Sequence, residues 1–193
     1  KNLRNKFCYC KMKNKSLITV KIIPQLNDNY SYLIIENQSS AVIVIDPAES
    51  EPILKVIKKD KLILKSILLT HHHTDHTAGV EKILTYLKVP VYSPSIKISG
   101  TTNPINDEEN IDLEFINMQI IKTPGHTFDH IVYYNKKNNI LFSGDTLFRL
   151  GCGRVFEGSY EEMYDSLKKI EVLDDETMVY CGHEYTNNNI SFL

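Results

Sequence analysis

The chain has 193 residues, of which 42% are hydrophobic and 24% are charged, and its formal net charge is −2. This length suits one domain with a sizeable core, and the near-neutral charge excludes attraction to nucleic acid or anionic lipid through overall charge. No apolar run approaches the roughly 18 residues that span a bilayer. We therefore expect a soluble protein, with a monomer favoured, that binds neither nucleic acid nor membrane.

The N-terminal part is basic: residues 1–21 carry seven Lys or Arg side chains and no acid. We expect residues 1–15 to be an extension, either a disordered tail or the remnant of a leader, and residues 16–193 to be one domain. Four cysteines are too few for a disulfide framework and indicate a reducing compartment. They are Cys8, Cys10, Cys152 and Cys181. A cytoplasmic location is expected, with an organelle as the alternative if the extension is a leader.

Apolar segments rich in β-branched residues recur along the chain and predict strands. These segments are 17–23, 30–35, 41–46, 66–70, 111–123, 130–134, 139–143 and 177–182. Helical spacing of apolar residues predicts three helices, at 51–61, 77–88 and 159–173. Strands and helices intermix, and 41–46 is continuously apolar, as in a strand covered on both faces. The pattern therefore indicates an α/β fold of mixed sheets with outer helices.

The segment "LLTHHHTDHTAG" places four histidines and an aspartate within six positions, directly after a predicted strand. On a helix, His71 and His73 would lie about 200° apart, so they could not share a face. In extended or loop backbone, both rings lie on one side and can bind one ion. Asp75 and His76 add a carboxylate and a third imidazole. A solvated histidine tract is the alternative, and His72 is the member predicted not to bind metal.

Three further residues occur in the same context as this segment. His126 in "TPGH", Asp145 in "FSGD" and His183 in "YCGH" each follow a predicted strand and a glycine that lets the backbone turn. Strand ends that converge on one edge of a sheet are where open α/β folds build their sites. Together with the first segment they offer five histidines and two aspartates, which is enough for two ions.

The ligands divide naturally around one carboxylate. A carboxylate can bridge two ions through its two oxygens, whereas a neutral imidazole cannot, so Asp145 is the predicted bridge. The remaining predicted ligands are His71, His73 and His126 for one ion, and Asp75, His76 and His183 for the other. Asp75 and Asp145 are also the candidate catalytic residues. Nitrogen and oxygen ligands without thiolate suit two divalent ions, with Zn²⁺ favoured and iron or manganese as alternatives.

Two ions about 3.5 to 4 Å apart lower the pKa of bound water, so that hydroxide forms at neutral pH, and they polarise the attacked carbonyl. The chain contains no G-x-S-x-G segment that would present a serine nucleophile. The predicted chemistry is therefore hydrolysis by metal-bridging hydroxide, without a nucleophilic side chain.

"THHHTDH" followed by a later His, Asp and His resembles the metallo-β-lactamase superfamily, which implies an αββα sandwich of two mixed sheets over residues 16–193. Four segments are more specific, and they are "LNDNYSYLI" (26–34), "TPGHTFDHI" (123–131), "GDTLFRLGCGRVFEG" (144–158) and "CGHEYTNNN" (181–189). They are similar to the glyoxalase II family of hydroxyacylglutathione hydrolases. The resemblance runs from about Ile22 to the last residue.

This resemblance implies hydrolysis of S-D-lactoylglutathione to D-lactate and glutathione, a step of methylglyoxal detoxification. A thioester suits the predicted site, since its thiolate leaving group has a pKa of about 8.5 and needs little acid assistance. The family contacts glutathione through positions that correspond here to Arg154 and Tyr185. Phe156 stands where the family often has a second tyrosine, so that contact lacks its hydroxyl. A surface pair with Glu157 is the alternative for Arg154, and core packing is the alternative for Tyr185.

Two other functions remain open at this stage. A mononuclear iron persulfide dioxygenase of the same superfamily also carries a GDxLxxxGCGR-like segment, but "RVFEG" and "HEYTNNN" favour the hydrolase. The family's C-terminal helical domain, which binds glutathione, would begin where this sequence ends, and we expect it to be absent. An inactive fragment that binds metal is therefore the second alternative.

Overall fold

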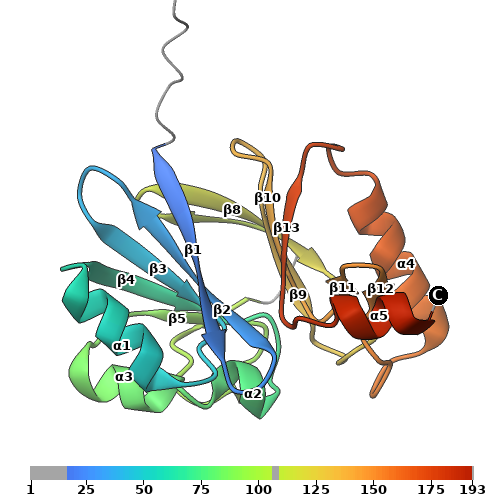
Figure 1. The fold of residues 1–193 in the computed structure, drawn as a ribbon, viewed down its shortest axis with the longest axis horizontal. Coiled ribbons are helices and arrows are strands. Elements are labelled where there is room, and N and C mark those ends of the chain that lie inside the picture. Colours follow the sequence, from blue (N-terminus) through green and yellow to red (C-terminus); the bar gives the residue numbers. More distant parts are fainter. Residues whose placement is uncertain (1–16, 106–108, 193) are drawn as a thin grey trace, which may run out of the picture.

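The computed structural model describes residues 17–105 and 109–192. The predicted extension 1–15, with Cys8 and Cys10, lies outside the described residues. Two β-sheets pack face to face, and helices cover their outer faces (Figure 1). This αββα sandwich confirms the predicted fold class. None of the helices in the described part combines the length and the apolar character that crossing a bilayer requires, and the expected compartment stays a prediction.

The first sheet has six strands in the spatial order β1 to β6. They are β1 (Ile18–Gln25), β2 (Asn29–Glu36), β3 (Ala41–Ile45), β4 (Ile63–Leu68), β5 (Val91–Ser93) and β6 (Asn103–Pro104). The first three strands pair antiparallel and the others parallel, so the sheet is mixed. All five residues of β3 are buried, as its continuous apolar run predicts. Helices α1 (Ser50–Lys59) and α3 (Val80–Tyr86) pack on the outer face through residues such as Ile53 and Ile83.

The second sheet has five strands in the order β13-β10-β9-β8-β7. They are β7 (Asn110–Leu113), β8 (Ile116–Lys122), β9 (Ile131–Asn135), β10 (Ile140–Gly144) and β13 (Met178–Cys181). Helix α4 (Tyr160–Glu171) covers the outer face, where Ile170 joins a cluster with Val132 and Leu141. Ser159 caps α4 through a capping box with Glu162. The short elements are α2 (Thr74–Thr77), β11 (Leu147–Phe148), β12 (Gly151–Cys152) and α5 (Thr186–Phe192).

The single strand predicted for 111–123 is wrong, because the segment forms the hairpin β7–β8. Leu113 pairs with Ile116 across a two-residue turn, and Glu114 adopts the left-handed conformation with φ 30°. No glycine, proline or asparagine marks this turn. The sequence still marks this turn in one way. Apolar residues alternate with polar ones on odd-numbered positions up to Leu113 and on even-numbered positions from Ile116.

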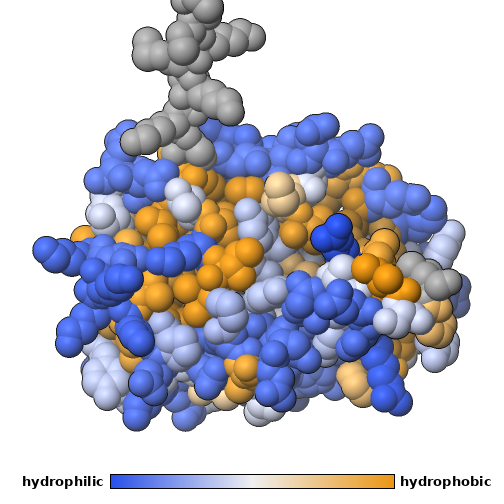
Figure 2. Space-filling model, viewed as in Figure 1, coloured by the Kyte–Doolittle hydropathy of each residue, from blue (hydrophilic) through white to orange (hydrophobic). Residues whose placement is uncertain are grey.

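The main core lies between the two sheets and combines residues of both, including Ile34 and Ile43 of the first and Met118 and Tyr133 of the second. It approaches the surface at the edge strands β1 and β13, where Ile22 and Met178 are exposed. Figure 2 shows apolar residues gathered over β1 and its neighbours, with hydrophilic residues around them. The sandwich is therefore less completely covered along this side.

Replacing Phe142 with alanine should strongly destabilise the sandwich. Its ring is 1% exposed and its centroid lies 5.5 Å from that of Tyr32 and 5.3 Å from that of Tyr180. Loss of this packing is expected to lower the free energy of unfolding by about 3–5 kcal/mol in urea denaturation. The matched control is Phe192→Ala, since Phe192 is 91% exposed, and a change within about 0.5 kcal/mol is expected. Similar losses in both variants would contradict this packing role.

Candidate metal centre

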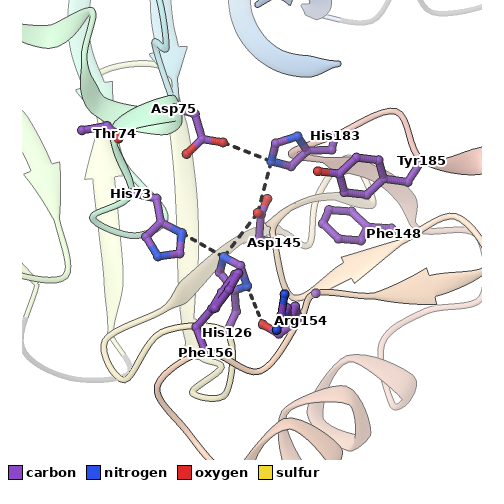
Figure 3. A pocket seen from close by; sticks show the side chains of 11 residues that line it. His73, Thr74, Asp75, His126, Asp145, Phe148, Arg154, Phe156, His183 and Tyr185 are labelled. Carbon is purple, nitrogen blue, oxygen red and sulfur yellow. Dashed lines mark hydrogen bonds and ion pairs between the residues drawn. The ribbon is translucent and has the colours of Figure 1, made fainter. Parts of the chain in front are cut away.

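The seven predicted ligands follow strand ends, and the structure brings them together between the two sheets. Figure 3 shows His73, Asp75, His126, Asp145 and His183 of this set. His71 and His73 follow β4, and the short helix α2 then carries Asp75 and His76. The other three come from the second sheet: His126 follows β8, Asp145 follows β10 and His183 follows β13. Both sheets therefore contribute to one site.

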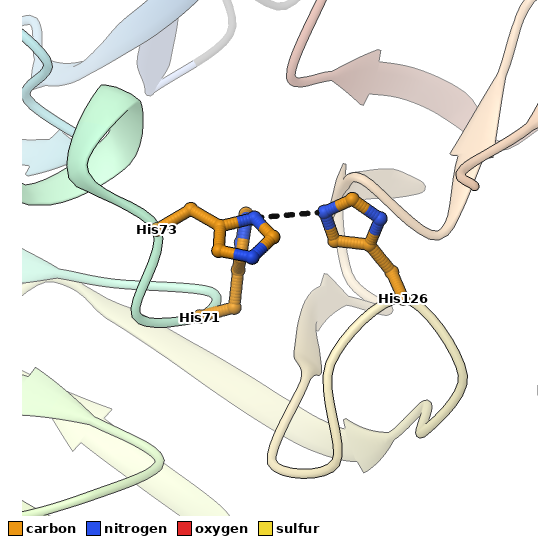
Figure 4. Close-up of side chains that lie close together, drawn as sticks. All are labelled: His71, His73 and His126. Atoms are coloured by element: carbon orange, nitrogen blue, oxygen red, sulfur yellow. Dashed lines mark hydrogen bonds between the residues drawn. The ribbon is translucent and has the colours of Figure 1, made fainter. Parts of the chain in front are cut away.

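His71, His73 and His126 form the first ligand group (Figure 4). His73 Nδ1 lies 3.1 Å from His71 Nε2 and 3.0 Å from His126 Nε2. The backbone at His73 is extended, with φ −59° and ψ 142°, which agrees with the predicted loop spacing. Three imidazole nitrogens that converge in this way fit a single divalent cation.

Asp75, His76 and His183 form the second group. His183 Nε2 lies 3.4 Å from both His76 Nε2 and Asp75 Oδ2, and His76 Nε2 lies 3.7 Å from the same carboxylate oxygen. Two imidazoles and one carboxylate thus also present their ligand atoms to one point, which offers a second place for a cation.

Asp145 lies between the two groups and is 5% exposed. Its Oδ2 is 3.4 Å from His126 Nε2 and 3.2 Å from His183 Nε2, while Oδ1 is 3.3 Å from His76 Nε2. Among the described residues, Oδ1 makes no hydrogen bond although it is buried. A buried carboxylate oxygen without a hydrogen bond is costly unless a cation compensates it. The donor set and this oxygen together fit divalent metal ions on both sides of Asp145.

In four of the five histidines, the ring nitrogen that faces away from the ligand groups contacts an oxygen. These contacts are His71 Nδ1 with Thr70 Oγ1 (3.0 Å), His76 Nδ1 with Asp46 Oδ2 (3.0 Å), His126 Nδ1 with the Arg154 carbonyl (2.8 Å) and His183 Nδ1 with Asp28 Oδ1 (2.9 Å). A carbonyl or carboxylate accepts, and the Thr70 hydroxyl accepts while it donates to Asp46. Nδ1 therefore donates its proton there, and Nε2 is the atom that can bind a cation once it carries no proton. This arrangement prepares the Nε2 atoms to bind a cation.

Sequence reasoning missed the acidic and amide partners of the ligands. Asp46 accepts from the Thr70 amide and hydroxyl as well as facing His76, and Asn29 donates to Asp75 Oδ2 at 3.0 Å. Asp46 directly follows the fully buried strand β3, but no glycine precedes it, so the rule that selected Asp145 did not find it. Asp28 and Asn29 lie in a segment that the sequence marked only by resemblance.

His130 is a further buried residue behind the site, and the motifs did not single it out. Its Nε2 accepts from the Asp145 amide at 3.1 Å, and its Nδ1 faces Thr123 Oγ1 at 3.0 Å and Thr146 Oγ1 at 3.1 Å. Burial lowers the pKa of His130 to about 3, so the ring is neutral. It supports the turn at Gly144, whose φ is +48° and where a Cβ would lie 2.6 Å from Thr70 Oγ1.

A pocket of about 600 Å³ opens beside the ligand atoms and includes Arg154, Phe156 and Tyr185 in its lining. Tyr185 stacks on His183 with a centroid distance of 4.9 Å and an interplanar angle of 5°. The Arg154 guanidinium lies 5.1 Å from the centroid of the Phe156 ring. The structure therefore places the three predicted substrate contacts around the ligand groups, with Phe148 as an additional aromatic wall (Figure 3).

Comparison with known proteins defines the class. The family model "Metallo-beta-lactamase superfamily" matches residues 26–183. Among solved structures, ETHE1 from Myxococcus xanthus aligns with a TM-score of 0.76 and 29% identity, covering 86% of this chain and 76% of that one. TTHA1623, solved in a di-iron-bound form, aligns with a TM-score of 0.71 and 28% identity, covering 86% of this chain and 92% of that one.

A curated relative narrows the assignment from the superfamily to one family within it. A protein of Psychromonas ingrahamii named hydroxyacylglutathione hydrolase is 41% identical over 182 residues, which are 92% of this chain and 69% of the relative. The chain therefore belongs to the metallo-β-lactamase superfamily and, within it, to the hydroxyacylglutathione hydrolase family.

Metal affinity should fall as the solution becomes more acidic. Burial disfavours the charged form of His76 and His183, but the surrounding carboxylates, above all Asp145, outweigh burial and raise each pKa to about 10. A raised pKa means that each ring holds a proton below about pH 10, and that proton must leave before the nitrogen binds a cation. We expect the apparent Zn²⁺ affinity to fall about tenfold per pH unit for each displaced proton. Chelator competition at pH 6, 7 and 8 measures this, and a constant affinity would contradict it.

Proposed function

We propose that this chain is a metal-dependent hydroxyacylglutathione hydrolase, which hydrolyses S-D-lactoylglutathione to D-lactate and glutathione. The observation that carries the proposal is the buried Asp145 carboxylate between two converging ligand groups, beside a pocket with aromatic walls and one guanidinium. The 41% identity to a hydroxyacylglutathione hydrolase over most of the chain supports the choice of reaction. We also propose that the protein acts on this small molecule as a monomer.

The proposed ligand assignment follows the two groups and places Asp145 between them as a bridge. The ligands are His71, His73 and His126 for one ion, Asp75, His76 and His183 for the other, and Asp145 for both. We propose zinc for both ions, with iron or manganese as alternatives. Bound there, a pair of divalent cations supplies hydroxide at neutral pH and Lewis-acid polarisation of a carbonyl.

The ionised state of Asp75 and Asp145 favours a thioester substrate over an amide substrate. The hydrogen bond from His183 lowers the pKa of Asp75. Burial opposes ionisation of Asp145, but the charge of His76 outweighs it and holds the pKa of this carboxyl well below its usual value. Both groups are therefore carboxylates at neutral pH and cannot protonate a leaving group. A thiolate leaves without a proton, whereas an amide nitrogen requires one.

The pocket residues suit the rest of the substrate. Arg154 is the one Lys or Arg side chain among the described residues that line the pocket, and it can pair with a glutathione carboxylate. Phe148 and Phe156 provide apolar walls that exclude water from the reacting carbonyl. Tyr185 is held against His183 by ring stacking, so its hydroxyl group can donate to the tripeptide near the ligands.

The zinc-loaded chain is expected to hydrolyse S-D-lactoylglutathione, which is followed by loss of thioester absorbance. Chelation should abolish the activity and added zinc should restore it, because no serine or cysteine is among the described residues that line the pocket. An amide analogue of the substrate is the control and should remain intact. One iron per chain together with oxygen consumption on glutathione persulfide would instead favour the dioxygenase, and activity on neither compound would favour the inactive fragment.

Replacing Asp145 with alanine should disturb both ions, whereas His183→Ala should chiefly weaken one. The reason is position, since Asp145 contacts both groups and His183 belongs to the second. Elemental analysis after dialysis is expected to give close to zero metal for the first variant and about one ion for the second. Asp165→Ala, at an exposed position of α4, is the control and should keep the parent value. Two retained ions in the Asp145 variant would refute the bridge.

A further inference from the structure

His130 is a buried histidine that belongs to neither ligand group. It is 1% exposed, and its ring stacks on the ring of His71 with a centroid distance of 4.8 Å and an interplanar angle of 25°. Its Nε2 accepts a hydrogen bond from the backbone amide of Asp145 at 3.1 Å. A backbone amide can only donate, so Nε2 carries no proton and the proton of this ring lies on Nδ1.

Two threonine hydroxyls provide the partners of that proton. Nδ1 lies 3.0 Å from Thr123 Oγ1 and 3.1 Å from Thr146 Oγ1, and the Thr146 hydroxyl donates to Thr123 Oγ1 at 2.9 Å. Both threonines are fully buried. A hydroxyl oxygen can accept from Nδ1, so His130 has a donor facing one ring nitrogen and acceptors facing the other. One neutral tautomer of the ring satisfies all of these contacts.

The bond from Asp145 to His130 lies where the chain leaves β10. Gly144, the last residue of that strand, has φ +48°, and a Cβ there would lie 2.8 Å from His130 Nε2. Glycine therefore lets the ring approach the backbone closely. The Asp145 amide that follows needs a partner, because an unpaired amide in a buried position costs free energy. The partner is a side chain of the neighbouring strand end, not another backbone group.

A displaced backbone at Asp145 would displace the carboxylate as well, since only Cα and Cβ separate the amide nitrogen from it. The carboxylate oxygens lie 3.2 to 3.4 Å from ring nitrogens of both ligand groups. Functional groups at such a centre must be held to within about 0.5 Å. The amide bond to His130 therefore bears on the distance from Asp145 to both groups at once.

We propose that His130 is a positioning residue: by accepting from the Asp145 amide, its Nε2 holds the carboxylate between the two ligand groups before a cation binds. His130 does not bind a cation itself. The inference rests on the proposed ligand assignment, in which Asp145 is shared by both ions. Loss of the bond should weaken the binding of both ions, whereas loss of a ligand from one group should chiefly weaken one.

NMR tests the hydrogen bond without reference to activity. A hydrogen bond between two nitrogens gives a scalar coupling between their ¹⁵N nuclei. We expect this coupling between the Asp145 amide nitrogen and His130 Nε2, both in the zinc-loaded chain and after chelation. The ¹⁵N shifts of the ring should also place its proton on Nδ1. A proton on Nε2, or a coupling that is absent from the metal-free chain, would overturn the proposal.

Metal affinity separates positioning from a role in packing alone. His130→Phe keeps a ring but has no acceptor, and chelator competition should show about a ten- to hundredfold loss of affinity for both zinc ions. His130→Gln offers an acceptor and a donor at the end of its side chain and should stay within about threefold of the parent. Ile57→Ala is the control, since it removes buried packing between α1 and the first sheet. It should bind zinc as the parent does.

Unchanged zinc affinity in His130→Phe would overturn the proposal. Equal losses in His130→Phe and His130→Gln would also overturn it, because they would show that only the shape of the ring matters. If His130→Phe does not fold, a loss of about tenfold or more in His130→Gln overturns the proposal. A parent that shows the coupling but binds no zinc would refute the ligand assignment, and with it the role of this bond at a bridge. A parent that binds two zinc ions without the coupling would refute the role of His130 alone.

Discussion

The buried carboxylate of Asp145 is the interaction on which the site depends. A carboxylate that is 5% exposed is tolerated only when positive charge or donors surround it. Here imidazole nitrogens from both ligand groups surround it, and within the described part of the chain its own Oδ1 makes no hydrogen bond. The backbone of Asp145 is held from behind by His130. Much of the buried polar structure around it serves to keep this group in one orientation.

The two ligand groups form only if the two sheets pack so that their strand ends meet. One ligand group takes two histidines from the first sheet and one from the second, and the other group is divided between the sheets as well. Backbone and side-chain bonds join the sheets beside the ligands: Ile131 N donates to Thr70 O at 3.0 Å, and the Tyr133 hydroxyl donates to Leu69 O at 2.8 Å. The apolar core therefore aligns two sets of strand ends whose side chains are useful only together.

The candidate metal ligands and the proposed substrate contacts lie on parts of the fold that are held in different ways. Four of the five candidate ligand histidines contact an oxygen through their second nitrogen. By contrast, Arg154 and Phe156 lie on an irregular segment that depends on side-chain contacts. Enzymes commonly combine a rigid catalytic centre with a pocket wall that is held less firmly.

The sequence by itself determined the strand ends, the residue types and their spacing. His71, His73, Asp75 and His76 lie on one short segment, and local backbone geometry decides which side each faces. Tertiary structure decided the rest, because the partners that orient these side chains are distant along the chain. Asp28 reaches His183 across 155 positions and Asp46 reaches His76 across 30. Those contacts follow from how the strands pair and how the sheets pack, and no local pattern of residues encodes them.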